Sequence, residues 1–356
     1  MQSLMTQKNK DLLLRIGKQW AVIFFVAELI FFGLTAKGFF TVNTFQIVLF
    51  FGTAIMLMAV GELFVIITGG IDLSVGYVMG LSSIVSTKLI VAFAGSGLPE
   101  LGAILLGILI TLVLGLIPGM INGLLISRLN VPPFIATFSM LGISHGVSEL
   151  LITEGAAKNL PHMANVIGNG HFLYFAQESG FSFFVRPEVA RGVKVFELLP
   201  NVVVMTFILV AIFAFVLKRT VFGVHTYAIG GNEDSAVRSG INVKNHIMKI
   251  YMLSSFLAAS AGVIYMLKYV TGKADAGASL LLDSIAAVVI GGASLSGGSG
   301  TVWKAILGAV IIAVLETGLR ILGIPTFDKY IMVGVILIFA VLIDQVFPET
   351  TYKDKE

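Results

Sequence analysis

The chain has 356 residues, of which 57% are hydrophobic and 12% are charged, and its mean hydropathy is +0.97. Because soluble domains carry about 25% charged residues, this composition excludes an ordinary water-soluble protein. The net charge of +3 indicates no nucleic-acid partner, and the absence of cysteine excludes disulfides, thiolate metal sites and a cysteine nucleophile.

Long apolar runs separated by short polar breaks predict an all-α fold, a polytopic transmembrane helix bundle that forms one domain over residues 1–356. The alternating polarity of a transmembrane barrel is missing. The eighth run is only long enough for a half-helix or a broken helix. In chain order, we expect about ten spans at residues 19–36, 45–68, 72–94, 100–126, 133–152, 200–218, 247–268, 280–291, 302–321 and 328–347.

The amino-terminal region is basic, and the first apolar run continues too far, without an A-x-A-like site, for a cleaved signal peptide. We therefore interpret that run as a retained first span. An even number of spans puts both termini on one side, and the positive-inside rule makes that side the cytoplasm. The basic residues concerned are Lys8, Lys10, Arg15 and Lys18.

Two polar segments interrupt the apolar pattern. Residues 153–199 are expected to form an external loop with a small helix or hairpin of its own, and residues 218–249 a cytoplasmic loop. In the second loop, GGNEDSAVRSGINV (residues 230–243) predicts a helix of about 8 residues, roughly 12 Å long. Asn232 is its N-cap, acids fill its first turn and Gly240 ends it. Such a helix packs either on this chain's own membrane domain or on another protein.

Two glycine-rich breaks share the frame GGxxLSxG. They are GGIDLSVG at residues 69–76 and GGASLSGGSG at residues 291–300. Paired glycines permit a tight turn, after which Asp72 or Ser294 can cap the next helix. Asn122-Gly123-Leu124 and Thr317-Gly318-Leu319 form a second, fainter echo. The span count places both frames on the cytoplasmic side, which suits a parallel internal repeat; an inverted repeat would require a counting error at the short eighth span.

The capped stretch of the cytoplasmic loop resembles the coupling loop of ATP-binding-cassette importer permeases, which sits in a groove on the ATPase. The match holds at Glu233, Ala236 and Gly240, whereas Asp234 and Ser235 stand where Glu and Ala are common. The resemblance implies an ATPase-coupling set of Asn232, Glu233, Asp234, Ala236, Arg238 and Gly240.

The two glycine frames, AIGGNE, SGINV and the tail IAAVVIGGASLSGGSGTVWKAILGAVIIAVLETGLRILGIP closely resemble the monosaccharide branch of that superfamily, the ribose, xylose and galactose type. The resemblance covers residues 45–345 apart from the 153–199 loop. It implies the permease subunit of an ATP-driven importer, which moves a monosaccharide or small polyol across the bacterial cytoplasmic (inner) membrane by alternating access. The partners it implies are a second permease chain in a homodimer, a cytoplasmic ATPase, an external substrate-binding protein and membrane lipid.

The chain itself lacks the phosphate-binding motif G-x-x-x-x-G-K-[ST], so ATP must bind to a partner and the chain is expected to hold no cofactor and to be no enzyme. The sequence also lacks a G-x-S-x-G elbow in a strand-to-helix setting, so nothing in it supports hydrolase chemistry. Five histidines show no metal-ligand spacing such as H-E-x-x-H, so no metal site is predicted.

Acids in apolar runs cost about 2.5 to 3.5 kcal/mol at a helix centre on insertion scales, so they should face protein or water. Helix capping is favoured for Asp72 and Asp283, an i,i+4 pair with Arg320 for Glu316, and a bundle contact for Glu28. Glu62 lines the path or makes an interhelical hydrogen bond. The candidate translocation residues are Glu62, Gly69, Gly70, Asp72, Ser74, Ser294 and Ser296.

Two alternatives stay open from the sequence. An ion-coupled secondary transporter would use Glu62 or Asp72 for protons or sodium, and would accumulate its solute without a partner. The other alternative is a non-transporting membrane scaffold or a channel, and single-chain conductance in a planar bilayer would favour the channel.

Overall fold

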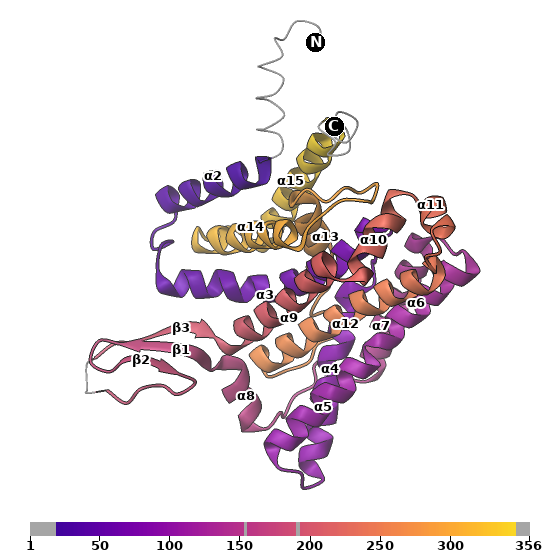
Figure 1. Ribbon diagram of the computed structural model, residues 1–356. Helices are drawn as coiled ribbons and strands as arrows, with labels where there is room; N and C mark the ends of the chain where they lie inside the picture. Colours follow the sequence, from indigo (N-terminus) through magenta and orange to yellow (C-terminus); the bar gives the residue numbers. More distant parts are fainter. Residues whose placement is uncertain (1–18, 153–154, 190–192, 347–356) are drawn as a thin grey trace, which may run out of the picture.

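A computed structural model describes residues 19–152, 155–189 and 193–346 (Figure 1). Each predicted span coincides with helical structure, with ends that agree to within four residues, and the predicted all-α polytopic bundle is confirmed. The basic residues Lys8 to Lys18 lie outside the described residues. The span helices are α2 (Trp20–Thr35), α3 (Val42–Ile67), α4 (Val75–Gly95), α5 (Glu100–Leu114), α6 (Leu116–Leu129), α7 (Pro133–Leu150), α9 (Asn201–Arg219), α12 (Val243–Tyr269), α13 (Leu280–Ile290), α14 (Val302–Ile321) and α15 (Thr326–Val346).

Within the described residues, six stretches are long and apolar enough to cross a membrane, namely α3, α4, α5 with α6, α9, α12 and α14. Helices α2 and α13 are apolar but shorter. The 11 residues of α13 rise about 16 Å, so the eighth span is a half-helix as predicted. Helices α7 and α15 occupy two further predicted spans but are not among these six stretches.

Helices α3 and α12 form the centre of the bundle (Figure 1). In the most apolar 18-residue stretch of each helix, 89% of α3 and 78% of α12 is buried, whereas only 28% of α9 is buried. Helix α12 packs on α3, α4 and α6, and α3 packs on α13 and α14. The central pair therefore faces protein on nearly all sides, while α9 lies at the periphery where lipid is the solvent.

The predicted span 100–126 is interrupted at Gly115, which separates α5 from α6. Pro118 explains the break, because a proline lacks the N–H that would bond to the carbonyl of Leu114 and its ring clashes with that carbonyl. The helical direction resumes at once, so the two pieces form one hydrophobic stretch, Glu100–Leu129.

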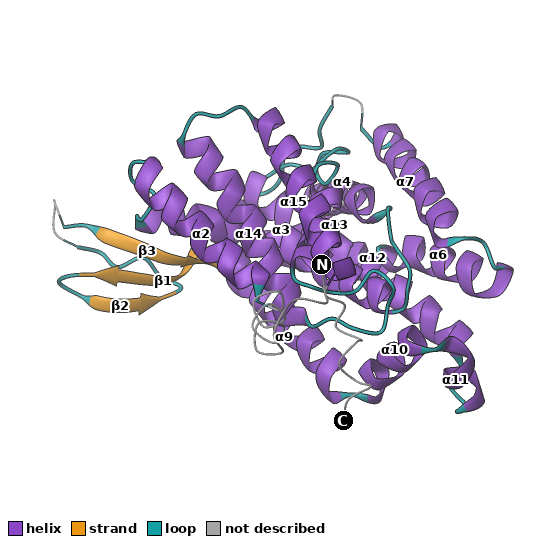
Figure 2. Ribbon diagram, turned by 90° about the horizontal axis from the view of Figure 1, so that it is seen from above, coloured by secondary structure: helices purple, strands orange, loops and turns teal. Residues whose placement is uncertain are grey.

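The segment predicted as an external loop folds into a small subdomain that contains α8 (His162–Asn169) and the strands β1 (His171–Ala176), β2 (Gly180–Phe183) and β3 (Val195–Pro200). The sheet order is β2-β1-β3, and both pairs are antiparallel, with Leu173 opposite Phe183 (Figure 2). The predicted helix or hairpin is thus confirmed, and a third strand extends it.

The predicted cytoplasmic loop contains α10 (Val221–Gly231) and α11 (Glu233–Arg238). Both views show these helices at the end of the molecule opposite to the sheet (Figures 1 and 2). That separation is the one expected of segments on opposite sides of a membrane.

Candidate functional site

Helix α11 begins at a side-chain cap. Asn232 is extended at φ −166° and ψ 109°, and its Oδ1 accepts a hydrogen bond from the backbone N–H of Ser235 at 2.7 Å. Glu233 and Asp234 follow in the first turn, where the positive end of the helix dipole favours acids, and Arg238 lies in the last turn. The predicted N-cap and charge pattern are confirmed.

The helix is six residues long rather than the predicted eight. It ends early because the backbone N–H of Ser239 already turns back to the carbonyls of Ser235 and Val237. Gly240 then takes a φ of +82°, the left-handed conformation that glycine adopts at low cost. The glycine therefore terminates the helix as expected, one residue beyond the C-cap Ser239.

One face of α11 is anchored and the rest is exposed. Ala236 is buried in a small apolar cluster with Ile229 and Val243, whereas Glu233 and Asp234 are exposed. A small residue at the anchoring position brings the helix close to the membrane domain. The charged tip is left available to a second protein.

Side-chain hydrogen bonds fix the loop to the bundle. Thr226 Oγ1 of α10 lies 2.9 Å from His246 Nε2 of α12, and both residues are buried. At the same end, Arg128 Nη2 of α6 donates to Asn245 Oδ1 at 2.7 Å. A displacement of α10 and α11 would thus be transmitted to α12.

The predicted cytoplasmic loop meets the second glycine frame beside the end of α3, where the first frame begins. The backbone N–H of Gly298 donates to the carbonyl oxygen of Ile67 at 2.8 Å, and the hydroxyl of Tyr227 donates to the carbonyl oxygen of Gly300 at 2.6 Å. A Cβ on Gly230 would collide with the same Ile67 carbonyl. Both frames therefore lie at the same end of the bundle, as the span count predicted.

The first frame turns sharply after α3. Gly69 has a φ of +80°, and a Cβ on Gly70 would lie 2.5 Å from the Tyr251 hydroxyl oxygen. A Cβ on Gly297 would lie 3.3 Å from the Gly69 nitrogen. Of the candidate path residues, the structure thus brings Gly69 against the second frame and Gly70 against Tyr251 of α12.

Ser294 and Ser296 lie in the second frame but cap no helix. The Ser294 hydroxyl oxygen accepts the N–H of Ser296 at 3.3 Å, and α14 is capped instead by Thr301, whose Oγ1 accepts the N–H of Lys304 at 3.4 Å. The capping prediction for Ser294 is wrong because seven residues, 295–301, lie between it and the start of α14 at Val302.

Asp72 is the centre of a buried hydrogen-bond cluster. Its Oδ1 accepts the N–H of Ser74 at 3.0 Å and the Ser74 hydroxyl at 2.6 Å, while its Oδ2 accepts the Ser254 hydroxyl at 2.9 Å. Asn122 Nδ2 donates to the Ser74 hydroxyl oxygen at 3.1 Å. The cluster ties together α4, α6 and α12. The capping prediction for Asp72 is wrong, since Ser74 occupies the N-cap of α4 without a side-chain capping bond.

Glu62 of α3 contacts this cluster. It is completely buried, and its Oε2 accepts the N–H of Asp72 at a long 3.4 Å. Its Oε1 has no hydrogen-bond partner within the described part of the chain. Both carboxyl oxygens of Glu28, in α2, are likewise buried without a partner there. Glu62, Asp72 and Ser74 thus form one buried group, apart from Ser294 and Ser296.

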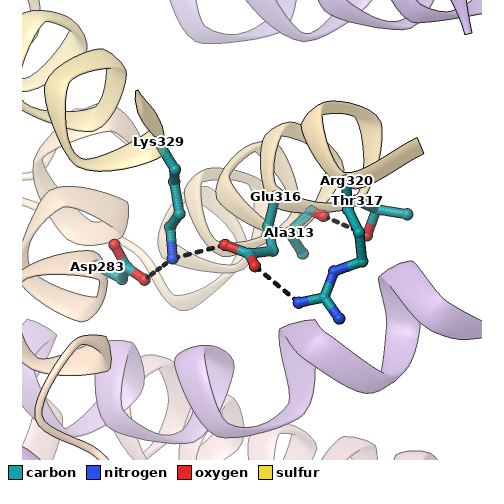
Figure 3. Close-up of polar contacts among 6 residues, drawn as sticks. All are labelled: Asp283, Ala313, Glu316, Thr317, Arg320 and Lys329. Atoms are coloured by element: carbon teal, nitrogen blue, oxygen red, sulfur yellow. Dashed lines mark hydrogen bonds and ion pairs between the residues drawn. The ribbon is translucent and has the colours of Figure 1, made fainter. Parts of the chain in front are cut away.

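A second polar group, which the sequence analysis only partly predicted, connects α13, α14 and α15 (Figure 3). Lys329 Nζ lies 2.7 Å from Asp283 Oδ2 and 2.8 Å from Glu316 Oε2, and Arg320 Nη2 donates to Glu316 Oε1 at 3.0 Å. The predicted Glu316–Arg320 pair is confirmed. The capping prediction for Asp283 is wrong, because this acid lies inside the first turn of α13 and pairs with Lys329.

Lys329 was missed as a site residue. A lone lysine at the start of the predicted span 328–347, in a chain with two unbalanced acids in neighbouring spans, was the available signal. The aromatic residues that surround this network carried no such signal, since 27 Phe and 8 Tyr are spread along the chain.

Together, the fold and these sites define a polytopic membrane transport protein. An apolar helix bundle holds buried carboxylates inside, and a capped acidic helix projects from one end. The described residues include no group of three or more His, Asp or Glu side chains placed to hold a metal ion.

Comparison with known proteins then gives the family. Residues 44–341 match the family described as the branched-chain amino acid transport system / permease component, and the chain belongs to this family. It is therefore a transport permease subunit rather than an enzyme. No solved structure matches the chain.

The named relatives are sugar permeases. The chain is 39% identical to the ribose import permease protein RbsC of Bacillus subtilis over 293 residues, which is 81% of this chain and 80% of the relative. It is 34% identical to the galactose/methyl galactoside import permease protein MglC of Salmonella typhimurium (81% and 82% covered). It is 32% identical to the D-allose transport system permease protein AlsC of Escherichia coli (89% and 87% covered). The predicted resemblance to the monosaccharide permeases is confirmed.

Proposed function

We propose that this chain is the membrane-spanning permease of an ATP-driven importer that moves a monosaccharide across the bacterial cytoplasmic membrane. The named relatives import ribose, galactose and allose, three sugars of one chemical class. The chain has no phosphate-binding motif, so a separate ATPase supplies the energy. An external protein delivers the sugar to the outer face, and two copies of the permease pair around the path.

The observation that carries this proposal is the position of α11. Its acidic first turn is exposed and its Ala236 is anchored. The preceding α10 contacts the second glycine frame through Tyr227, and through Gly230 it contacts Ile67, two residues before the first frame. An ATPase that moves α11 would therefore act on the turns beside Ile67 and Gly298. We propose that this coupling drives alternating access, with α11 and both termini in the cytoplasm.

In this mechanism the turn at Gly69 and Gly70 separates the buried polar cluster from the cytoplasmic end. Glu62, Asp72 and Ser74 are buried. Asp72 and Ser74 follow the turn at Gly69 and Gly70 directly, and Glu62 precedes it by about two turns of α3. Movement of that turn would open the cluster to a sugar, whose hydroxyls can donate to carboxylates and accept from serines. Ser294 and Ser296 would line the same opening from the second frame.

The experiment is ATP-driven uptake of radiolabelled D-ribose, D-galactose or D-allose into vesicles that contain the permease with its co-expressed neighbouring subunits. The double variant Glu233→Ala, Gly240→Pro removes an exposed acid and the left-handed turn. Sugar uptake should therefore fall at least tenfold, although the same sugar is supplied to the vesicles. Glu178→Ala, the same change at an exposed acid of the external segment, is the matched control. Full uptake by the unmodified chain alone, without ATP or a partner, would contradict the proposal and favour an ion-coupled carrier.

A further inference from the structure

A partly enclosed cavity of about 230 Å³ lies where α3, α12 and α14 meet the start of α15. Its volume is below the about 300 to 1,000 Å³ of sites for drug-sized ligands, and it suits a ligand of one ring. Its walls combine rings with charged groups. The aromatic lining residues are Phe50, Phe51, Tyr265, Tyr269 and Tyr330.

The cavity lies at the end of the bundle that carries the sheet subdomain. Lys268 joins the two, since its Nζ lies 4.2 Å over the Phe50 ring and its carbonyl oxygen accepts Asn169 Nδ2 of α8 at 3.0 Å. Along α3, Phe51 is 16 residues from Ile67, or about 24 Å. The cavity is therefore remote from the point where the cytoplasmic loop touches the glycine frames.

Two tyrosines give the cavity both apolar faces and hydroxyl groups. The rings of Tyr265 and Tyr269 lie 4.6 Å apart at 44°, and Phe50 meets Tyr269 edge to face at 5.9 Å and 75°. Neither tyrosine hydroxyl has a hydrogen-bond partner among residues 19–152, 155–189 and 193–346. Each can therefore bond to a ligand hydroxyl while the rings pack against C–H groups.

The charged side of the cavity is held in place from behind. Glu316 Oε2 pairs with Nζ of the buried Lys329 at 2.8 Å, and Glu316 Oε1 accepts a hydrogen bond from Arg320 Nη2 at 3.0 Å. The Arg320 guanidinium lies 4.5 Å over the Phe51 ring, and the Arg320 side chain is 57% exposed, so it keeps donors free for a ligand. A carboxylate and a guanidinium fixed side by side can accept from and donate to neighbouring hydroxyls of one molecule.

We infer that this cavity is a monosaccharide-binding site within the permease itself, occupied by the sugar on the outer side before it reaches the buried Asp72 cluster. Glu316 accepts from sugar hydroxyls, Arg320 and the tyrosine hydroxyls donate to or accept from others, and the ring packs on Tyr269. This inference rests on the proposed function for the class of ligand, and it adds residues that recognise the sugar after the external binding protein releases it.

The test measures sugar binding directly. The full-length chain, purified with its co-purifying subunits in nanodiscs, is titrated with D-ribose, D-galactose and D-allose by saturation-transfer NMR, with L-leucine as a control of different chemistry. At least one sugar should bind saturably and L-leucine should not. Tyr269→Phe, which removes only a hydroxyl, should weaken binding about threefold to tenfold, and Glu316→Gln at least about tenfold.

Matched controls separate recognition from folding. Tyr77→Phe and Glu149→Gln make the same changes outside the cavity and should bind sugar as the unmodified protein does. Thermal melting of each variant shows whether Glu316→Gln has unfolded the protein, and Tyr269→Phe leaves the ring packing in place. Unchanged sugar affinity in Tyr269→Phe and in a folded Glu316→Gln protein would overturn the inference, as would equal binding of L-leucine.

Uptake measured on the same preparations keeps the two proposals apart. ATP-driven sugar uptake that the cavity variants leave unaltered overturns the inference alone. Saturable sugar binding that both variants weaken, in a complex that never transports sugar with ATP, overturns the proposed function and supports the cavity as a binding site.

Discussion

The backbone N–H of Gly298 donates to the carbonyl oxygen of Ile67 across 2.8 Å, which joins the last residue of α3 to a glycine turn 231 residues later in the chain. At the same carbonyl, Gly230 of α10 approaches so closely that no side chain can be added. The carbonyl oxygen of Ile67 thus contacts both α10, which would move with an ATPase bound to α11, and the glycine turn before α14.

Gly230→Ala should uncouple transport. The new methyl group would collide with the Ile67 carbonyl, so α10 must move away from the frames, and overpacking of this kind costs about 1 to 3 kcal/mol. We expect uptake in the reconstituted complex to fall at least about tenfold, measured with labelled sugar and ATP. Gly231→Ala is the matched control, because nothing lies within 4 Å of its added Cβ. Equal uptake by the two variants would argue against this contact as the coupling point.

Ser254→Ala should destabilise the bundle centre. The substitution removes a hydrogen bond at 2.9 Å to the buried Asp72 carboxylate, and bonds to charged groups contribute about 1.5 to 3 kcal/mol. Thermal unfolding in detergent should shift accordingly. Ser260→Ala, in the same helix, loses only a bond to the Phe256 carbonyl of its own helix and should change far less. A smaller shift for Ser254 than for Ser260 would contradict the role given to Asp72.

Lys329→Met should destabilise the protein by about 3 to 5 kcal/mol, because it leaves Asp283 buried without its cation. Adding Asp283→Asn to Lys329→Met should recover part of that loss, since the remaining Glu316 keeps Arg320 as its partner. Melting temperatures of the two single variants and the double variant complete the cycle. Strict additivity would mean that the 2.7 Å pair contributes nothing to folding.

The sheet subdomain should weaken in acid. Burial lowers the pKa of His171 below its ordinary value of 6.5, although Glu197, 3.7 Å away, opposes that shift. The folded segment therefore binds a proton less readily than the unfolded one, and its stability falls as the pH drops below 6.5 toward the folded pKa. Hydrogen exchange of β1 and β3, corrected for intrinsic rates, should be faster at about pH 5.5 than at about pH 7.5. His171→Gln should remove that difference, and an unchanged pH dependence in the variant would refute the assignment.

Much of the bundle could be predicted from the sequence because membrane helices must be long and apolar. The observed helix ends differ from the predicted ones where a capping side chain extends the helix beyond the apolar run. Helix α12 begins at Val243 rather than 247, because Asn242 Oδ1 caps it by accepting the N–H of Asn245 at 3.1 Å. The three strands were only partly predicted, since runs of four to six residues carry little periodic signal.

The site was less predictable than the fold. The N-cap and glycine of α11 are local features, so Asn232 and Gly240 could be predicted from spacing alone. The partners of Asp72 and Lys329 depend on contacts between residues 182 and 46 positions apart, which no local pattern reports. The capping prediction for Asp283 failed for that reason, because this buried acid pairs across helices with Lys329 rather than with the N–H groups of its own first turn.

The most direct test of the account is the side of the membrane on which α11 lies and what covers it there. The chain has no cysteine, so Glu233→Cys introduces a single thiol on this exposed turn, and Phe181→Cys does the same on the exposed sheet. A membrane-impermeant maleimide should label position 233 only in inverted vesicles, and less when the ATPase subunit is bound, while position 181 reacts in intact cells. Labelling of position 233 from outside intact cells, or unaltered labelling with the ATPase bound, would contradict the proposed coupling.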